Sequence, residues 1–352
     1  MKQWFLLAFI LSFALLSVVT LTSLDQALAA RQLLFFLLGV LVFFGVQRLS
    51  FSQILSLSPW FYLTVFVLLV LVLFLPETRG THRWLSFGGI FDLQPSQLAV
   101  PAVLLFTLEL KRYIKKPVWY WLGTLAAIAL IGALIFFEPD LGMSLLVGFV
   151  SLNLIWLQPL KSRYVVSAAI VGAVVVFVAW TFLLRPYQKL RITSFINPQE
   201  VETASNYNVR QSIIAVGSGQ ILGRGMEKGV QSQLQFLPEQ ETDFIFAAFS
   251  EEFGWIGSSL VVVLYGILLT YLLRFSRRVE GSEQLFISSV FAYFLFQVSI
   301  NIGMNIGLAP VTGIALPLFS HGGSSLLTSC GMLGITQVVF NETRQKSALH
   351  IA

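Results

Sequence analysis

Residues 4–24 read WFLLAFILSFALLSVVTLTSL, a stretch of 21 residues without a charged side chain. A helix of this length rises about 30 Å, which matches the hydrocarbon thickness of a bilayer. The stretch begins directly after Met1-Lys2-Gln3, and no small-residue cleavage site follows a short apolar core. We therefore interpret it as a retained membrane span rather than a signal peptide.

Stretches of the same kind recur along all 352 residues. Hydrophobic residues make up 56% of the chain and charged residues only 11%, whereas a soluble domain carries about 25% charged residues. We predict an all-α integral membrane protein, a single polytopic domain over 1–352 with about ten transmembrane helices. The predicted spans are 4–24, 33–50, 60–75, 94–110, 118–137, 141–158, 164–184, 243–273, 285–308 and 322–340.

The distribution of Lys and Arg predicts the orientation in the membrane. If both termini are cytoplasmic, 13 of the 22 Lys and Arg lie at the cytoplasmic face, as the positive-inside rule requires. These are Lys2, Arg48, Lys111, Arg112, Lys115, Lys116, Lys161, Arg163, Arg274, Arg277, Arg278, Arg344 and Lys346. Most of the others lie in the large extracytoplasmic loop 185–240, between the seventh and eighth spans, which is too short to fold independently.

The net charge of +5 is therefore explained by orientation and by contact with anionic lipids, and we expect no nucleic-acid partner. Cys330 is the one cysteine and lies inside the last predicted span, so no internal disulfide can form.

Polar side chains gather in three outer segments. Pro76–Leu85 is followed by Gln94-Pro95-Ser96-Gln97 and suggests a re-entrant or interfacial loop, and Glu138-Pro139-Asp140 is a tight connection with two carboxylates at its seam. The third segment is the glycine-rich end of the long loop, which leads into Phe236–Phe246. Repeated glycines there could bring backbone N–H groups close to an anion such as a diphosphate.

Asp243 lies where this polar loop meets an apolar run, a costly place for a carboxylate. Partial desolvation would raise its pKa towards the range of a general base. The alternative is that it complements the dipole of the helix that begins there. Asp140 has a similar pair of interpretations, because it could coordinate a cation or orient an arginine, or it could cap a helix at the Pro139 turn.

Cationic side chains of the outer segments could receive the charge of a phosphate, or could contact lipid headgroups. They are Arg83, Arg185, Lys189, Arg191, Arg210, Arg224 and Lys228. Trp84 could stack on a sugar, although a tryptophan at the membrane interface needs no such role. Asn301 and Asn305 recur at helical spacing and suggest hydrogen bonds between helices, and Glu251 and Glu252 suggest a polar face inside the bundle.

Several of these segments together resemble one family. They are Arg83-Trp84-Leu85, Gln94-Pro95-Ser96, Glu138–Gly142, Gly217–Gly225, Phe236–Phe246, Asn301–Met304 and Pro310–Ser325. In this combination and order the chain resembles the SEDS (shape, elongation, division, sporulation) family, membrane glycosyltransferases that polymerise peptidoglycan from lipid II. The Leu-Pro-Glu and Pro-Val-Thr-Gly-Ile segments resemble the elongation branch of that family.

The resemblance implies that Asp243 is the catalytic aspartate of an inverting polymerase that releases undecaprenyl diphosphate. It implies substrate contacts in the matching segments and outer loop: Arg83, Trp84, Asp140, Arg191, Arg210, Lys228, Glu239, Ser324 and Ser325. It also implies the bacterial inner membrane, lipid II and a nascent glycan strand as ligands, and a class B penicillin-binding protein as the cross-linking partner. A divalent cation, Mg²⁺ or Mn²⁺, could bridge to Asp243, but the sequence contains no metal-ligand motif.

The chain departs from the family at four positions. The usual Gln-Pro-Ser-Glu-x-x-Lys has Gln97 and Val100, and Glu241 and His321 replace the usual His and Tyr. The neutral pair avoids one unpaired buried charge but leaves its role in binding lipid II open. A lipid II flippase, or a non-catalytic scaffold for the penicillin-binding protein, is the alternative function.

Overall fold

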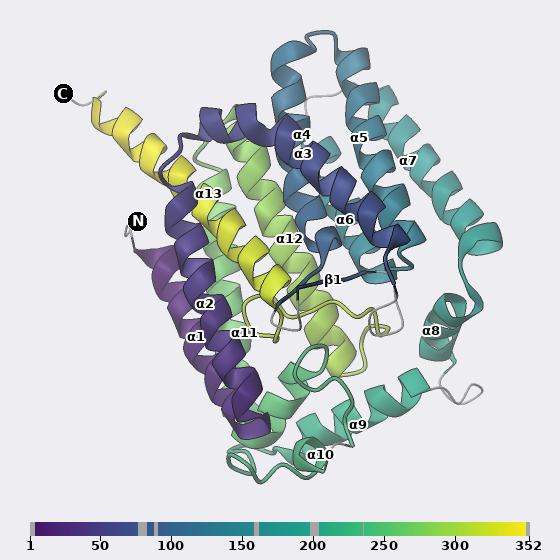
Figure 1. Cartoon of the computed structure of the whole chain (residues 1–352), viewed down its shortest axis with the longest axis vertical. Coiled ribbons are helices and arrows are strands. Elements are labelled where there is room, and N and C mark those ends of the chain that lie inside the picture. The colour runs from purple at the N-terminus through teal and green to yellow at the C-terminus, as the bar shows by residue number, and fades with distance from the viewer. Residues whose placement is uncertain are drawn as a thin grey trace.

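Each predicted span coincides with a helix in the computed structural model, which describes residues 4–76, 83–87, 91–157, 162–197, 204–234 and 236–349. These helices lie together as one bundle, and α8, α9 and α10 of the long loop cover one end of it (Figure 1). The bundle helices are α1 (Phe5–Leu24), α2 (Gln26–Val46), α3 (Phe51–Phe74), α4 (Ala99–Tyr113), α5 (Pro117–Phe137), α6 (Leu141–Trp156), α7 (Ser162–Val178), α11 (Ile245–Ser276), α12 (Gly281–Asn305) and α13 (Gly323–Leu349).

Seven helices of the described part are long and apolar enough to cross a membrane by themselves. The helices α4 and α6 have only 15 and 16 residues, and the bent pair that runs from Ala169 to Phe182 and from Pro186 to Ile196 would count as an eighth span. The 3₁₀ helix η1 (Pro95–Leu98) extends α4 at its N-terminal end. The protein is therefore a multi-pass membrane protein in which two spans are short.

The second helix begins earlier than the sequence suggested, at Gln26 instead of residue 33. Asp25 separates α1 from α2 in an extended conformation, and its carboxylate accepts a hydrogen bond from Ala27 N at 2.7 Å. An N-cap of this kind satisfies a free N–H group of the first turn. Gln32 is buried and donates to Ser17 Oγ and to Ser320 O, so polar residues that appeared to lie outside the span are partnered within the fold.

The third helix also begins earlier, at Phe51 instead of residue 60. Ser50 and Gln53 form a capping box, a start signal that the sequence Ser-x-x-Gln carried and that our prediction overlooked. Pro59 lies inside the helix and has no N–H to donate to the carbonyl of Leu55. The hydroxyl of Ser58 donates to Leu55 O at 2.6 Å instead, which keeps that carbonyl satisfied.

The connection after α3 contains a small β-hairpin that the all-α prediction did not include. Strands β1 (Leu85–Phe87) and β2 (Phe91–Leu93) pair antiparallel, with Leu85 opposite Leu93. Ser324, at the start of α13, accepts a hydrogen bond from Gln94 N at 2.9 Å and donates to Asp92 O at 3.2 Å. The hairpin is thus fixed to the end of the bundle where the outer segments meet.

The long loop contains three helices: α8 (Pro186–Ile196), α9 (Ala204–Ser218) and α10 (Val230–Gln233). The segment between α9 and α10 pairs with α11 at a break in that helix, where Gly254 has a φ of 67°. Arg224 N donates to Glu251 O and Gly225 N to Glu252 O, each at 3.0 Å. The loop backbone therefore takes the place of helical partners that α11 loses at its break.

The loop glycines allow this close packing. A Cβ at Gly219 would lie 2.0 Å from Ser250 O, and one at Gly223 would lie 2.1 Å from Glu252 O. Our hypothesis that these glycines offer N–H groups to an anion is wrong at Gly223 and Gly225, because both N–H groups donate to backbone carbonyls.

The side chain of Glu251, fully buried as the sequence suggested, anchors the same segment. It accepts hydrogen bonds from Gln231 N, Ser232 N and Ser232 Oγ, each at 3.0 Å, and from Ser218 Oγ at 3.3 Å. Its carboxylate thereby joins the end of α9, the segment of α10 and the break in α11.

Candidate functional site

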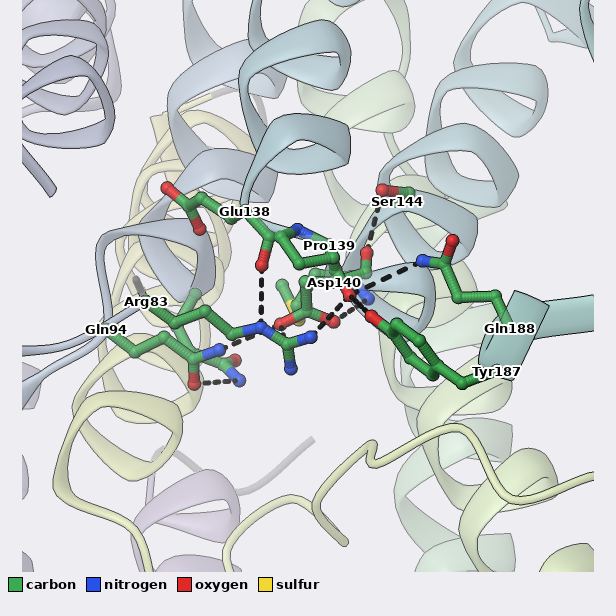
Figure 2. A network of polar contacts seen from close by, with 10 residues as sticks. Arg83, Gln94, Glu138, Pro139, Asp140, Ser144, Tyr187 and Gln188 are labelled. Carbon is green, nitrogen blue, oxygen red and sulfur yellow. Dashed lines mark hydrogen bonds and ion pairs between the residues drawn. The ribbon is translucent and has the colours of Figure 1, made fainter. Parts of the chain in front are cut away.

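The connection between α5 and α6 forms one half of the site, centred on Asp140 (Figure 2). One carboxylate oxygen accepts from Met143 N at 3.0 Å, which caps α6. The other accepts from Gln94 Nε2 at 3.0 Å and lies 3.7 Å from a guanidinium nitrogen of Arg83. The helix cap is therefore confirmed, and the same carboxylate also forms an ion pair with an arginine, whereas coordination of a cation stays a prediction.

Arg83 joins the segment before β1 to this connection. Its Nε donates to Glu138 O at 2.8 Å, and a terminal nitrogen donates to Pro139 O. From α8, Tyr187 OH and Gln188 Nε2 lie 3.3 and 3.5 Å from the same Pro139 carbonyl (Figure 2). Two segments far apart in sequence, the one before β1 and α8, therefore converge on the carbonyl of Pro139.

Glu138 is a feature of this half that sequence reasoning did not assign to the site. Its side chain is fully buried, and neither carboxyl oxygen has a hydrogen-bond partner among the described residues. The pKa of Glu138 is raised to about 9, mainly by burial and next by the charge of Asp140, whose effect exceeds the lowering effect of Arg83. The pKa of Asp140 is also raised by burial, although Arg83 opposes this. Glu138 is thus a neutral acid at neutral pH, and Arg83 compensates Asp140.

Asp243 forms the other half of the site, in the turn before α11. Three consecutive backbone carbonyls of this turn are held from outside it: Glu241 O by His321 N at 2.8 Å, Thr242 O by Ser320 Oγ at 2.6 Å, and Asp243 O by Asn301 Nδ2 and Asn305 Nδ2, each at 3.0 Å. The segment 307–322 and the end of α12 thereby fix the backbone that carries the carboxylate.

The carboxylate of Asp243 itself makes no hydrogen bond to a described residue, and the N-cap of α11 is Phe244, without a side-chain cap. The N–H of Ala247 in the first turn is shared between Phe244 O at 3.0 Å and Asn305 Oδ1 at 3.1 Å. Gly313 lies opposite, where a Cβ would come within 3.7 Å of Asp243 Oδ2. The carboxylate therefore does not cap α11 through a hydrogen bond, and it remains available to a ligand.

The pKa of Asp243 is raised to about 7, mainly by burial. Glu239, Asp140 and Glu241 raise it further, whereas Arg191 of α8 lowers it. The same Arg191 also lowers the pKa of Asp140. Arg191 thus acts on both carboxylates and links the two halves of the site electrostatically.

The other residues that we predicted to contact the substrate lie farther from the two aspartates or have other partners. Arg83 and Arg191 are the basic residues that act on the two aspartates, while Arg210 and Lys228 are exposed, on α9 and in the loop before α10. Trp84 is partly exposed beside Arg83, and Glu239 is exposed. Ser324 and Ser325 are buried at the start of α13, where Ser324 binds the hairpin. The contribution of these residues to substrate binding stays a prediction.

The neutral pair Gln97 and Val100 is buried behind Asp140. Gln97 Nε2 lies 3.4 Å from Gln94 Oε1, and Gln94 in turn donates to Asp140. Hydrogen-bonded amides therefore lead from η1 to the carboxylate of Asp140.

A base and cations at one membrane face suit transfer of a group from a phosphate ester. The base can accept a proton from an attacking hydroxyl, and the guanidinium groups can compensate a leaving phosphate. Within the described ranges, no three Asp, Glu, His or Cys side chains are grouped to hold a metal ion. The residues present thus do not form a protein-only metal centre.

Comparisons with known proteins agree with this geometry. Residues 1–345 match the sequence model of the cell cycle protein family FtsW/RodA/SpoVE. The chain is 35% identical over 297 residues to the peptidoglycan glycosyltransferase MrdB of Escherichia coli K12, covering 82% of this chain and 79% of that protein. It is 33% identical over 326 residues to the probable peptidoglycan glycosyltransferase FtsW of Coxiella burnetii, covering 89% and 86%.

Solved structures show the same architecture. A chain from a peptidoglycan synthase complex, described as coordinating polymerization and crosslinking, superimposes with a TM-score of 0.81 at 28% identity, covering 97% of this chain and 98% of that one. The rod shape determining protein RodA of Thermus thermophilus superimposes with a TM-score of 0.70 at 27% identity, covering 96% of both chains.

Proposed function

The chain belongs to the FtsW/RodA/SpoVE family and is a peptidoglycan glycosyltransferase, and we propose that it polymerises lipid II with Asp243 as its general base. One observation carries the assignment of the base. Asp243 has a carboxylate without a hydrogen-bond partner among the described residues, on a backbone held at three successive carbonyls, and with a pKa of about 7. A general base works best when its pKa lies near the working pH.

In the proposed reaction, Asp243 takes the proton of the 4-hydroxyl of the acceptor's GlcNAc. The freed oxygen attacks the anomeric carbon of the donor's MurNAc, and the bond from that carbon to the diphosphate breaks with inversion. Undecaprenyl diphosphate leaves with the electron pair of that bond, and Asp243 later releases its proton to water.

The growing negative charge of the leaving diphosphate requires cations. Arg191 fits this role because it acts on both aspartates from α8. Arg83 is already occupied with the carbonyls of Glu138 and Pro139, so we assign it to orienting Asp140. Because the described residues form no metal centre, no step of this proposal passes through a divalent cation.

The proposed partner is a class B penicillin-binding protein, which would cross-link the strands that this chain makes. The structural match to a chain from a complex that coordinates polymerization and crosslinking supports it. We further propose a role in cell elongation in the bacterial inner membrane, with both termini cytoplasmic and the site extracytoplasmic. The match to a rod shape determining protein and the placement of Lys and Arg support this.

The test is strand synthesis from labelled lipid II in proteoliposomes, with and without the penicillin-binding protein. We expect polymer from the wild type and none from Asp243→Asn, which keeps the shape of the side chain but cannot accept the proton. Glu283→Gln is the matched control, since Glu283 lies in the first turn of α12, about 27 Å along that helix from Asn301. Equal polymer from wild type and Asp243→Asn would refute the mechanism, and translocation without polymer would favour the flippase.

A further inference from the structure

Asn301 and Asn305 lie one turn apart at the outer end of α12, and both donate to the carbonyl oxygen of Asp243. We propose that these two asparagines are positioning residues: they set the direction of the catalytic carboxylate by fixing the peptide that carries it. This inference rests on the proposed role of Asp243 as base. It assigns a function to side chains that the sequence suggested only as links between helices.

The two hydrogen bonds converge on one acceptor. Each amide nitrogen lies 3.0 Å from Asp243 O, and a carbonyl oxygen has two lone pairs, so the pair of donors fills its capacity. Both asparagines are fully buried, and Asn301 Nδ2 also donates to Ile314 O at 2.8 Å. The peptide of Asp243 is therefore held between α12 and the segment that faces its carboxylate.

Asn305 also binds the first turn of α11, the helix that follows Asp243. Its Oδ1 accepts from Ala247 N at 3.1 Å, while its own backbone carbonyl accepts from Ser212 Oγ of α9 at 2.8 Å. One amide group thus binds the peptide before the first turn of α11 and an N–H within that turn, which Asn305 shares with the carbonyl of Phe244. Rotation of the turn relative to α12 would break both bonds.

This arrangement leaves the carboxylate free for chemistry. An aspartate beside a helix start commonly accepts from the first-turn N–H groups, which would occupy a base. Asp243 accepts no such bond from the described residues of α11, and its carboxylate faces charges instead: Glu239 and Glu241 of its own turn, Asp140 of the α5–α6 connection, and Arg191 of α8. Because these charges act from different elements, a change in the direction of the carboxylate changes its proton affinity.

The test compares Asn301→Ala, Asn305→Ala and the double variant with wild type, measuring kcat, KM and the pH dependence of kcat for labelled lipid II. We expect kcat to fall about 10-fold in each single variant and roughly 100-fold in the double variant, because misplacing a catalytic group is costly even without loss of binding. KM should stay within about twofold, and the acid limb of the kcat profile should move. Loss of general packing would not move that limb.

Ser289→Ala is the matched control, since Ser289 is a buried polar residue of the same helix, about 18 Å along it from Asn301. Its kcat profile should match wild type. If the double variant does not fold, Asn301→Ala alone decides, because it leaves the bond from Asn305 in place. Unchanged kcat and an unchanged acid limb in Asn301→Ala, together with an inactive Asp243→Asn, would overturn the positioning role alone. An active Asp243→Asn would instead remove the proposed base.

Discussion

The pKa of Asp243 makes the rate of polymerisation depend on pH in a direction that neighbouring charges should control. With a pKa of about 7, roughly one tenth of the carboxyl groups are ionised at pH 6 and about one hundredth at pH 5. An aspartate with an ordinary pKa of about 3.9 would be almost fully ionised at both. Because only the ionised form accepts a proton, kcat should fall about tenfold between pH 8 and pH 6.

Two substitutions should move this acid limb in opposite directions. Glu239 raises the pKa of Asp243, so Glu239→Gln should lower that pKa and retain more activity at pH 6. Arg191 lowers the pKa, so Arg191→Met should raise it and move the limb to higher pH. Arg191→Met should also reduce the plateau rate, since the leaving diphosphate loses a cation; the position of the limb and its height report the two effects separately.

The assay is the initial rate of strand synthesis in proteoliposomes at saturating lipid II, from pH 5 to pH 9. Glu283→Gln is the control for the loss of an acid remote from the site, a partly exposed residue that pairs with Lys346. A flat profile down to pH 5.5 in the wild type would refute the raised pKa. A shift of Glu239→Gln and Arg191→Met in the same direction would refute the electrostatic account, even if the wild-type profile fell as expected.

Three further outcomes are expected. Arg83→Met alone should reduce kcat/KM more than the double variant Arg83→Met/Asp140→Asn, because the single change leaves a buried carboxylate without its cation. A double-mutant cycle should give a coupling energy of about 1.5–3 kcal/mol between the two residues. Additive effects of the two substitutions would contradict the ion pair. Gly219→Ala should destabilise the protein by about 1–3 kcal/mol, because its Cβ would meet Ser250 O. Gly217→Ala is the control and should not destabilise it, because no atom lies within 4 Å of a Cβ at that position. Equal melting temperatures of the two variants would contradict the close packing of the loop against α11. Because the pKa of Glu138 is higher in the folded protein than in the unfolded chain, folding takes up a proton between these two values, and stability should decrease as the pH rises from about 4.5 through about 9. Glu138→Gln should therefore reduce the difference in melting temperature between pH 5 and pH 8. An unchanged difference would show that Glu138 is ionised in the folded protein.

Some residues of the site could be predicted from the sequence, and others could not. Asp140 and Asp243 were found because a carboxylate beside an apolar run is conspicuous in any membrane protein. The capping box at Ser50 was also present in the sequence, because Ser-x-x-Gln before an apolar run is a helix start signal. Glu138 was visible as a carboxylate, yet its lack of a hydrogen-bond partner depends on what surrounds it and has no signature in sequence.

The sequence by itself determined that the chain crosses the membrane repeatedly, where its spans lie and which end carries the polar segments. Hydropathy and charge are properties of short stretches, and the bilayer acts on each stretch separately. Only the tertiary structure decided that the carbonyl of Asp243 is held by Asn301 and Asn305, and that Arg83 reaches across to Asp140. These contacts join residues 57 to 62 positions apart, and they exist because desolvated polar groups must find partners wherever the packing of the helices brings them together.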